Sequence, residues 1–146
     1  MLLFYHFEIR KLFLVVRFMG FIIPKYGTKS SCNEFKKPAW KFRAHVAPLG
    51  VKFYTGKQFP EKYSNAIFIA QHGSWNRSNK IGYRIMVGFK TENNIDKMEV
   101  FASGWLDNKT QKAWGRPVAF AQMPDGSLLV SDDYADLIYR ISYEAN

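Results

Sequence analysis

From Trp40 onward, the chain consists of short runs of apolar residues separated by turn residues. The runs are rich in β-branched and aromatic side chains and are bounded by Gly, Asn and Pro, which is the pattern of β-strands. No amphipathic helix of useful length is expected after residue 40. The sequence therefore predicts an all-β domain. The expected strands are residues 50–56, 66–71, 81–89, 97–102, 116–122, 127–131 and 136–143.

The expected strands fall into a group of four and a group of three. The second group contains the turn Pro124-Asp125-Gly126, in which Gly126 accepts a positive φ angle and Asp125 caps the turn with its side chain. Short strands recurring in groups of four, with such a turn inside the group, are typical of β-propeller blades. A β-sandwich fragment explains the strands but explains their grouping less directly. We therefore expect about two propeller blades of antiparallel sheet.

Residues 1–39 have a different character. Residues 1–23 are strongly apolar, but four charged side chains, from Glu8 to Arg17, interrupt them, and no small-residue cleavage site follows. Their longest uninterrupted apolar run is far shorter than the roughly 20 residues that cross a bilayer. A poor signal sequence, an interfacial anchor and a non-native leader are the three interpretations. We expect an N-terminal segment with a linker at 1–39 and a propeller fragment at 40–146.

The net charge of +9 is concentrated in the first part of the chain. Residues 1–60 contain 11 Lys and Arg against two Glu, whereas residues 61–146 contain ten basic and ten acidic residues. A basic chain usually suggests nucleic acid or a membrane as its partner. Because the part with most of the expected strands is neutral, no nucleic-acid partner is expected. The single cysteine, Cys32, has no partner for an internal disulfide and no companions at metal-ligand spacing.

The densest polar chemistry follows the expected strand at 66–71 directly. The string His72-Gly-Ser-Trp-Asn-Arg77 combines an imidazole, an indole, an amide and a guanidinium at the point where a rigid strand becomes a loop. Such loops commonly carry binding residues, although the same string also suits an ordinary surface turn. A second segment, from Trp114 through Arg116 to Asp133, makes the combination more specific than either segment alone.

A set of short motifs occurs in an order and spacing that resemble a known family. They are His45-x-Ala47-Pro48-Leu49-Gly50, Phe53-Tyr54-x-Gly56, Phe59-Pro60, His72-Gly-Ser-Trp-Asn-Arg77, Gly82-Tyr83, Gly104-Trp105, Gly115-Arg116-Pro117, Pro124-Asp125-Gly126 and Ser131-Asp132-Asp133. Together they resemble the C-terminal third of L-sorbosone dehydrogenase-type proteins, relatives of the soluble pyrroloquinoline-quinone-dependent glucose and aldose sugar dehydrogenases. The resemblance covers about residues 41–143 and does not extend to residues 1–38.

This resemblance implies a fold, a cofactor and a substrate class. The fold is a six-bladed propeller whose central channel holds pyrroloquinoline quinone and a calcium ion. The substrate is a sugar or sugar aldehyde, and the expected location is periplasmic or membrane-associated. Because the quinone cofactor carries several carboxylates, cationic side chains are expected to hold it.

Four residues are candidates for binding the cofactor: Arg116, His72, Arg77 and His45. Arg116 matches the first arginine of the family's Arg-x-Arg-Asp-Val pattern, whereas Val118 replaces the second arginine. His72 and Arg77 fall near the position of a cofactor-contacting lysine in the family. His45 lies just before a strand that would begin a blade, and its ring would then face the channel.

No catalytic residue and no metal ligand is assigned. In the family, the histidine that acts as general base and the calcium ligands lie in earlier blades. Asp132 and Asp133 have oxygen ligands suited to calcium, but adjacent carboxylates in a turn are usually solvated. Trp75, Trp105 and Trp114 are expected to pack between blades rather than to support the cofactor.

Two functions of different classes follow. The first is an inactive C-terminal fragment of a quinone-dependent sugar dehydrogenase, because about two blades cannot close a ring around a cofactor. The second is a membrane-associated or protein-interaction module without catalysis, in which residues 1–23 contact anionic lipid and the strands pair with missing blades or another chain. A calcium-dependent lactonase-type propeller shares the Pro-Asp-Gly motif but gives no reason for the string that begins at His72.

The membrane alternative predicts that the N-terminal residues control lipid binding. The full chain is expected to sediment with liposomes that contain anionic lipid, whereas a version that begins at Trp40 stays in the supernatant. The reason is that the shorter version lacks most of the excess positive charge and the apolar run. Liposomes of neutral lipid are the control. Equal sedimentation of both proteins excludes attachment through residues 1–23.

Overall fold

The computed structural model describes residues 17–18, 21–22, 38–91 and 94–144. The chain divides into two compact units, Met1–Pro38 and Ala39–Asn146. In the first unit, β1 (Arg17–Phe18) and β2 (Phe21–Ile22) form an antiparallel pair. Within the described ranges, no helix is long and apolar enough to span a membrane. All four candidate cofactor-binding residues lie in the second unit.

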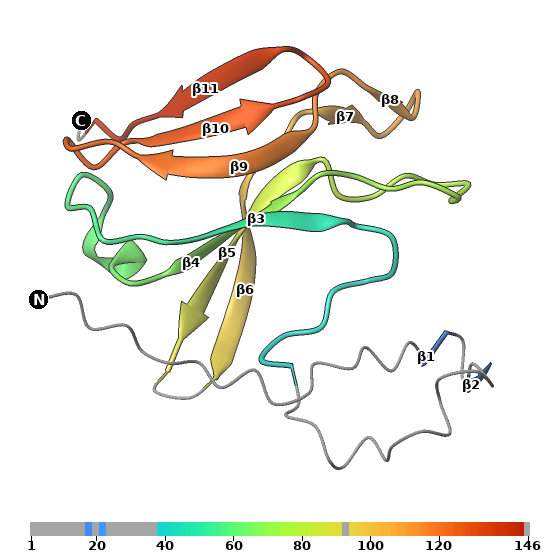
Figure 1. Ribbon diagram of the computed structural model, residues 1–146, viewed down its shortest axis with the longest axis horizontal. Coiled ribbons are helices and arrows are strands. Elements are labelled where there is room, and N and C mark those ends of the chain that lie inside the picture. Colours follow the sequence, from blue (N-terminus) through green and yellow to red (C-terminus); the bar gives the residue numbers. More distant parts are fainter. Residues whose placement is uncertain (1–16, 19–20, 23–37, 92–93, 145–146) are drawn as a thin grey trace, which may run out of the picture. The chain divides into compact units, whose positions relative to one another are not determined.

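The first sheet of the second unit has four antiparallel strands in chain order (Figure 1). Almost all apolar residues of its central strands, β4 and β5, are buried. β-branched and long apolar side chains favour such strands, which have a neighbouring strand on each side. A short 3-10 helix, η2 (Glu61–Tyr63), lies between β3 and β4. The strands are β3 (Pro48–Phe53), β4 (Ile67–Gln71), β5 (Arg84–Lys90) and β6 (Ile95–Ala102).

The second sheet has three antiparallel strands: β9 (Pro117–Gln122), β10 (Leu128–Asp132) and β11 (Leu137–Ile141). Between β9 and β10, Gly126 has a φ angle of 90°, and Asp125 Oδ1 accepts hydrogen bonds from the N–H and the hydroxyl of Ser127 at 2.9 and 2.7 Å. The predicted Pro-Asp-Gly turn is therefore confirmed.

A small hairpin of β7 (Leu106–Asp107) and β8 (Lys112–Ala113) lies between the two sheets in the chain. The strand pattern did not predict it, because a strand of two residues has no alternation to recognise. The strand expected at residues 81–89 begins only at Arg84. Gly82 and Tyr83, with φ angles of 88° and 52°, cannot continue a strand toward its N-terminal side.

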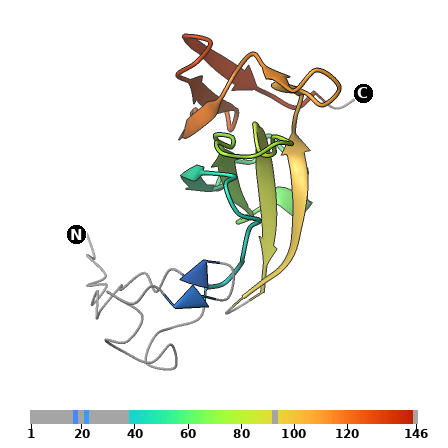
Figure 2. The ribbon, with the colours of Figure 1, turned by 90° about the vertical axis from the view of Figure 1, so that its right-hand side faces the viewer.

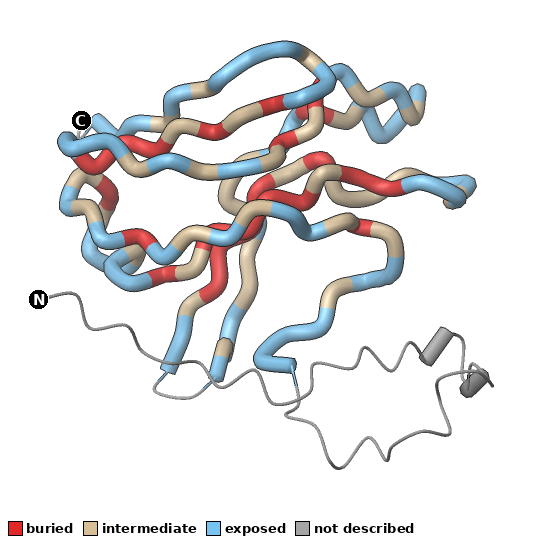
Figure 3. Tube along the Cα trace, in the orientation of Figure 1, coloured by how far each residue is buried: buried red, intermediate tan, exposed pale blue. Residues whose placement is uncertain are grey.

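The two sheets share one hydrophobic core (Figure 3). Alternate residues of β10, Leu128 and Val130, are fully buried in a cluster with Phe68 of β4 and Val87 of β5. The ring of Phe68 meets that of Phe101 edge-on, with 4.7 Å between the ring centroids. Burying one such aliphatic or aromatic side chain contributes about 1.5–3 kcal/mol. The apolar layer between the sheets therefore holds the domain together.

The first strands of the two sheets, β3 and β9, lie against each other although they are not paired (Figure 2). Gly50 makes this approach possible, since a Cβ atom at this position would lie 2.3 Å from the carbonyl oxygen of Val118 and 2.8 Å from the Cα atom of Ala119. Sheets that meet at their first strands are arranged like adjacent propeller blades. The predicted fold class, all-β with a partial propeller of about two blades, is confirmed.

The close approach at Gly50 predicts a large effect of a single substitution. Gly50→Val is expected to lower the free energy of unfolding by about 2 kcal/mol or more, because the added side chain meets backbone that no rotamer change can move. Urea unfolding followed by tryptophan fluorescence measures this change. The control is Val51→Ala at the next residue, whose side chain is exposed. Wild-type stability of Gly50→Val would show that β3 and β9 do not make this contact.

Candidate functional site

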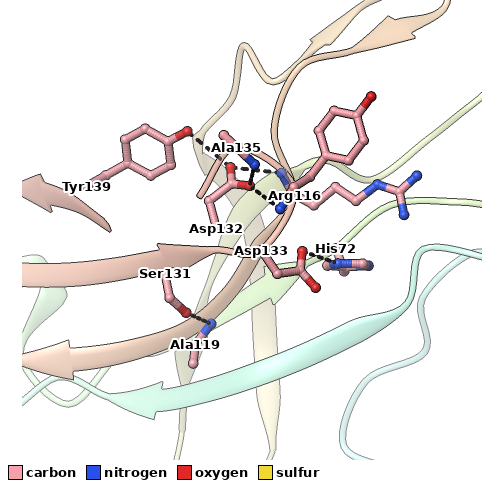
Figure 4. Close-up of polar contacts among 9 residues, drawn as sticks. His72, Arg116, Ala119, Ser131, Asp132, Asp133, Ala135 and Tyr139 are labelled. Atoms are coloured by element: carbon pink, nitrogen blue, oxygen red, sulfur yellow. Dashed lines mark hydrogen bonds and ion pairs between the residues drawn. The ribbon is translucent and has the colours of Figure 1, made fainter. Parts of the chain in front are cut away.

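Two of the four candidate residues, His72 and Arg116, lie at one end of the two sheets, where β4 and β10 end and β9 begins (Figure 4). His72 follows β4 directly, Asp133 follows β10, and Arg116 precedes β9. Because β3 and β9 hold the sheets together, the loops at this end of both sheets lie close to each other. Residues that are distant in the sequence therefore form one polar cluster.

His72 and Asp133 connect the two sheets. The Nε2 atom of His72 lies 2.8 Å from Oδ1 of Asp133. An ionised carboxylate only accepts hydrogen bonds, so Nε2 of His72 is the donor in this pair, and in that tautomer of the neutral ring Nδ1 is left to accept a hydrogen bond. Since the carboxylate is exposed, the pair contributes about 1 kcal/mol or less to stability. Its main effect is to orient the imidazole ring.

Arg116 places a guanidinium group beside this pair. Its Cζ atom lies 5.8 Å from the ring centroid of Tyr83 and 5.2 Å from that of Tyr134. Such cation–π contacts contribute about 0.5–1 kcal/mol at exposed sites. The Nε atom of Arg116 is buried and has no hydrogen-bond partner among the residues that the structure describes. A buried donor without an acceptor costs about 1–3 kcal/mol, so an anionic ligand would satisfy a group that the chain leaves unsatisfied.

The carboxylate of Asp132 fixes the backbone that carries the cluster. This side chain is only 4% exposed. Its Oδ2 atom accepts hydrogen bonds from the N–H of Arg116 at 2.8 Å and from the hydroxyl of Tyr139 at 3.1 Å. Its Oδ1 atom accepts bonds from the N–H groups of Tyr134 and Ala135 at 3.0 and 2.9 Å.

The environment of Asp132 favours its charged form. Burial by itself raises the pKa of this carboxyl, but the hydrogen bonds it accepts outweigh burial and hold the pKa below its ordinary value. The expectation of two solvated carboxylates is therefore wrong for Asp132, because the turn directs its N–H groups at this side chain. Asp133 is exposed as expected.

Arg77 lies in the β4–β5 loop, residues 72–83, and forms a hydrogen bond within that loop. Its Nε atom donates to the carbonyl of Asn79 at 3.0 Å. The loop also contacts the turn of the β7–β8 hairpin, since the N–H of Lys80 donates to Oε1 of Gln111 at 2.6 Å. Part of the Arg77 guanidinium is thus engaged locally.

His45 lies in the segment that precedes β3. Its backbone has a φ angle of 65°, and its ring meets that of Trp75 edge-on at 5.9 Å between centroids. Two residues later, the carbonyl of Ala47 accepts a hydrogen bond from the N–H of His72 at 3.0 Å. The structure therefore brings His72 and Arg116 into one cluster and places His45 and Arg77 in segments that adjoin it.

Tyr83 and Tyr134 are the residues that sequence reasoning missed. They flank Arg116 from the end of the β4–β5 loop and from the β10–β11 turn. In the sequence, the only feature that pointed to Tyr83 was its place in the Gly82-Tyr83 motif of the resemblance. Its side chain faces the second sheet, and only the packing of the sheets reveals this.

The three tryptophans differ in their surroundings. Trp105 belongs to the core cluster, as expected. Trp114 is half-exposed, but its ring lies 6.3 Å from that of Trp105, and its Nε1 atom donates to the carbonyl of Gly104 at 2.7 Å. Trp75 is 74% exposed. The expected packing role is therefore wrong for Trp75, because the loop that carries it extends away from both sheets (Figure 1).

The described residues of the cluster offer hydrogen-bond donors that suit an anionic ligand. In residues 38–91 and 94–144, no group of three or more His, Cys, Asp and Glu is placed to hold a metal ion. Both oxygens of Asp132 already accept hydrogen bonds within the chain. The calcium ion expected from the resemblance has no assigned ligand here.

Residues 18–144 match the model of a family described as TrAA12-like. An uncharacterised protein of Borreliella burgdorferi is 41% identical over 122 residues, which are 82% of this chain and 32% of that protein. This chain therefore spans about a third of the length of that relative. The match supports the predicted relationship to sugar dehydrogenase-like proteins at the level of the family.

Solved structures also resemble this chain. Iodide and calcium structures of a Trichoderma reesei carbohydrate-active enzyme of family AA12 each have a TM-score of 0.53 and 24% identity, covering 65% of this chain and 24% of theirs. This likeness shows the fold. The holo form of the pyranose dehydrogenase PQQ domain from Coprinopsis cinerea has a TM-score of 0.46 and 24% identity, covering 68% of this chain and 27% of that domain.

The hydrogen bonds of Asp132 predict a pH-dependent contribution to stability. Asp132→Asn is expected to lower the free energy of unfolding by about 2–3 kcal/mol near pH 7, because the amide turns a donor toward backbone N–H groups. A depressed pKa stabilises the fold above the ordinary carboxyl pKa of about 4, and this contribution is lost as pH falls through the lower folded value. The two proteins should therefore converge in stability below about pH 4.

Urea unfolding of both proteins between neutral and acidic pH measures this convergence. The control is Asp96→Asn, because Asp96 is an exposed residue of β6. Its stability should follow that of the wild type throughout. A difference between wild type and Asp132→Asn that stays constant over the whole pH range would contradict the assignment.

Proposed function

The chain belongs to the TrAA12-like family, and from this premise we propose that its two sheets form one wall of the cofactor channel in a pyrroloquinoline-quinone-dependent sugar dehydrogenase-type propeller. The observation that carries the proposal is the guanidinium of Arg116. Its Nε atom is buried without an acceptor in the described part of the chain, and it lies at the end of the sheets where His72 and Asp133 meet.

The residues of the cluster fit a cofactor with several carboxylates. Arg116 would hold one carboxylate through charge-assisted hydrogen bonds, which are stronger than neutral ones. Asp133 holds His72 so that the second ring nitrogen is available to the ligand. Arg77 and His45 are the further candidates, since their segments adjoin the cluster. When bound, the quinone would supply a two-electron acceptor for a hydride from the substrate.

The substrate class rests on the relatives rather than on this chain's own residues. The solved AA12 relatives are carbohydrate-active enzymes by name, so a sugar or sugar aldehyde is the substrate class proposed for the whole protein. Oxidation of L-sorbosone is the finer proposal, and its support is the motif order from His45 to Asp133. We assign neither a general base nor a calcium ligand to residues of this chain.

We further propose that this chain alone does not catalyse sugar oxidation. Its two sheets supply one side of a channel, and the faces of both sheets that point away from the shared core have no partner sheet among the described residues. Without an enclosing site, water competes with every polar contact to the ligand. The sheet faces that have no partner sheet among the described residues also favour the alternative function, an interaction module without catalysis.

The proposal predicts that Arg116 controls binding of the quinone. Titration of the full chain with pyrroloquinoline quinone, followed by quenching of tryptophan fluorescence, is expected to show binding that Arg116→Gln weakens about tenfold or more. Arg116→Lys tests the role of Nε, since lysine keeps the charge but offers no planar fork of donors. Lys57→Gln, at an exposed position in the loop after β3, is the matched control. Equal affinity of Arg116→Gln and wild type would refute the assignment.

The same protein tests the absence of catalysis. The full chain, supplied with the quinone and calcium, is assayed for dye reduction with aldoses as electron donors. The expected result is no reduction above the rate given by free quinone. Reduction of the dye well above the rate given by free quinone would contradict the claim that this chain alone is inactive.

A further inference from the structure

The first sheet has a pocket at the end opposite to the polar cluster. β4 begins beside this pocket and ends next to His72, and the antiparallel strand β5 ends at the pocket with Lys90. Since a strand rises about 3.3 Å per residue, the length of β4 separates the pocket from His72 and Arg116. Its volume of about 440 Å³ is in the range of small-molecule sites. We call it the lysine pocket, after Lys62 and Lys90 in its lining.

The two lysines enter the pocket from different elements, Lys62 from η2 and Lys90 from the end of β5. Nζ of Lys62 lies 4.8 Å from the ring centroid of Tyr63. Nζ of Lys90 lies 6.0 Å from the ring centroid of Phe53. No described carboxylate lines the pocket, and none of the ion pairs between described residues involves either lysine. The described residues therefore leave both positive charges of the pocket without a counter-charge.

The carboxylates that adjoin the pocket are engaged with other groups. The hydrogen bond from Lys97 is the largest cause that lowers the pKa of Glu99, and the positive charge of Lys62 is a smaller cause. The hydroxyl of Thr91, on the rim of the pocket, donates to Oδ1 of Asp96 at 3.4 Å. Neither carboxylate forms an ion pair with a lysine of the pocket.

The turn after η2 offers uncharged polar groups on a fixed backbone. The N–H of Asn65 donates to the carbonyl of Tyr54 at 2.9 Å, and the N–H of Ala66 donates to the carbonyl of Tyr63 at 3.0 Å. By contrast, the hydroxyl of Ser64 and the side-chain amide of Asn65 form no hydrogen bond with another described residue. These two groups are therefore available to a ligand with hydroxyl groups.

An apolar wall completes the pocket. It consists of Ala66, which is buried, and Phe89, whose ring lies 6.1 Å from that of Tyr63. Such a wall suits the C–H groups of a small ring, because they leave water when they pack against it. The lining thus combines two cations, a hydroxyl and an amide with an apolar side.

The charges of the pocket favour a phosphate monoester over a carboxylate. A phosphate monoester carries about −1.5 to −2 charges near pH 7, which matches the two ammonium groups. A carboxylate carries only one negative charge. The phosphate also has three strong acceptor oxygens for the donors of the lysines.

We propose that the lysine pocket is a binding site for a phosphorylated monosaccharide, with the phosphate held by Lys62 and Lys90 and the sugar hydroxyls by Ser64 and Asn65. The site is built entirely from residues of the first sheet and its loops. It needs neither the quinone nor a further sheet, so this inference goes beyond the proposed function.

The test is a titration of the full chain with glucose 6-phosphate, measured by calorimetry and, on isotope-labelled protein, by amide chemical shifts. The expected result is saturable binding with a dissociation constant of about 1 mM or lower. The shifts should gather at residues 64–66 and 89–91. Because the lysines are exposed, added salt should weaken the binding.

Variants of the two lysines test the phosphate contacts. Lys62→Gln and Lys90→Gln should each weaken binding about fivefold or more, because each removes a charge-assisted hydrogen bond. Both side chains are exposed, so the variants should melt like the wild type. Lys109→Gln, in the turn of the β7–β8 hairpin, makes the same change of charge and should bind like the wild type.

Three further ligands test the chemical class. Glucose, inorganic phosphate and glucuronate should each bind at least about fivefold more weakly than glucose 6-phosphate, because each lacks part of the recognised chemistry. Equal affinity for inorganic phosphate would overturn the sugar. Equal affinity for glucuronate or glucose would overturn the phosphate.

Three results overturn the site itself. The first is the absence of saturable binding up to about 10 mM glucose 6-phosphate. The second is binding that neither lysine substitution weakens. The third is a set of shifts confined to the β4–β5 loop and the start of β9, which assigns the ligand to the polar cluster. Lys62→Gln and Lys90→Gln should leave quinone binding by Arg116 unchanged, so the two proposals fail separately.

Discussion

The contact between β3 and β9 determines the positions of the other parts of the domain. At Gly50, the backbone of one sheet meets the backbone of the other with no side chain between them. The sheets therefore share a core whose central members are Phe68, Val87, Leu128 and Val130. The same contact brings the end of β4 to the end of β10, which lets His72 reach Asp133. A packing constraint in the middle of the strands thus creates the polar cluster at their ends.

The backbone of the polar cluster is held by hydrogen bonds, whereas its guanidinium group keeps an unsatisfied donor. Asp132 accepts hydrogen bonds from three backbone N–H groups and one hydroxyl, so the β10–β11 turn and the start of β9 are held in fixed positions. On this base, Tyr83 and Tyr134 flank the guanidinium of Arg116. The base satisfies its own hydrogen bonds, whereas Nε of Arg116 has no acceptor within the described residues. A preorganised cation with an unsatisfied donor is suited to an anionic ligand.

Much of the fold was predictable from the sequence, because strand-forming residues and turn residues act locally. The strand pattern gave seven strands in two groups, and the Pro124-Asp125-Gly126 turn has the expected geometry. The boundaries near Tyr83 and the β7–β8 hairpin were not predictable, since backbone angles in a loop depend on contacts outside it. The motif order indicated a relationship to quinone-dependent sugar dehydrogenases, and the match of residues 18–144 to the TrAA12-like family supports it at that level.

The sequence by itself determined the seven strands of the two sheets, the Pro124-Asp125-Gly126 turn, the relationship to sugar dehydrogenase-like proteins and the list of cationic candidates. Only the tertiary structure decided which candidates share a site: Arg116 and His72 do, while Arg77 bonds its own loop and His45 contacts Trp75. It also decided that Asp132 is buried, whereas its neighbour Asp133 is exposed and binds His72. The physical reason is that local propensity fixes each strand, but the distance between two strands' ends is set by side chains that pack between sheets.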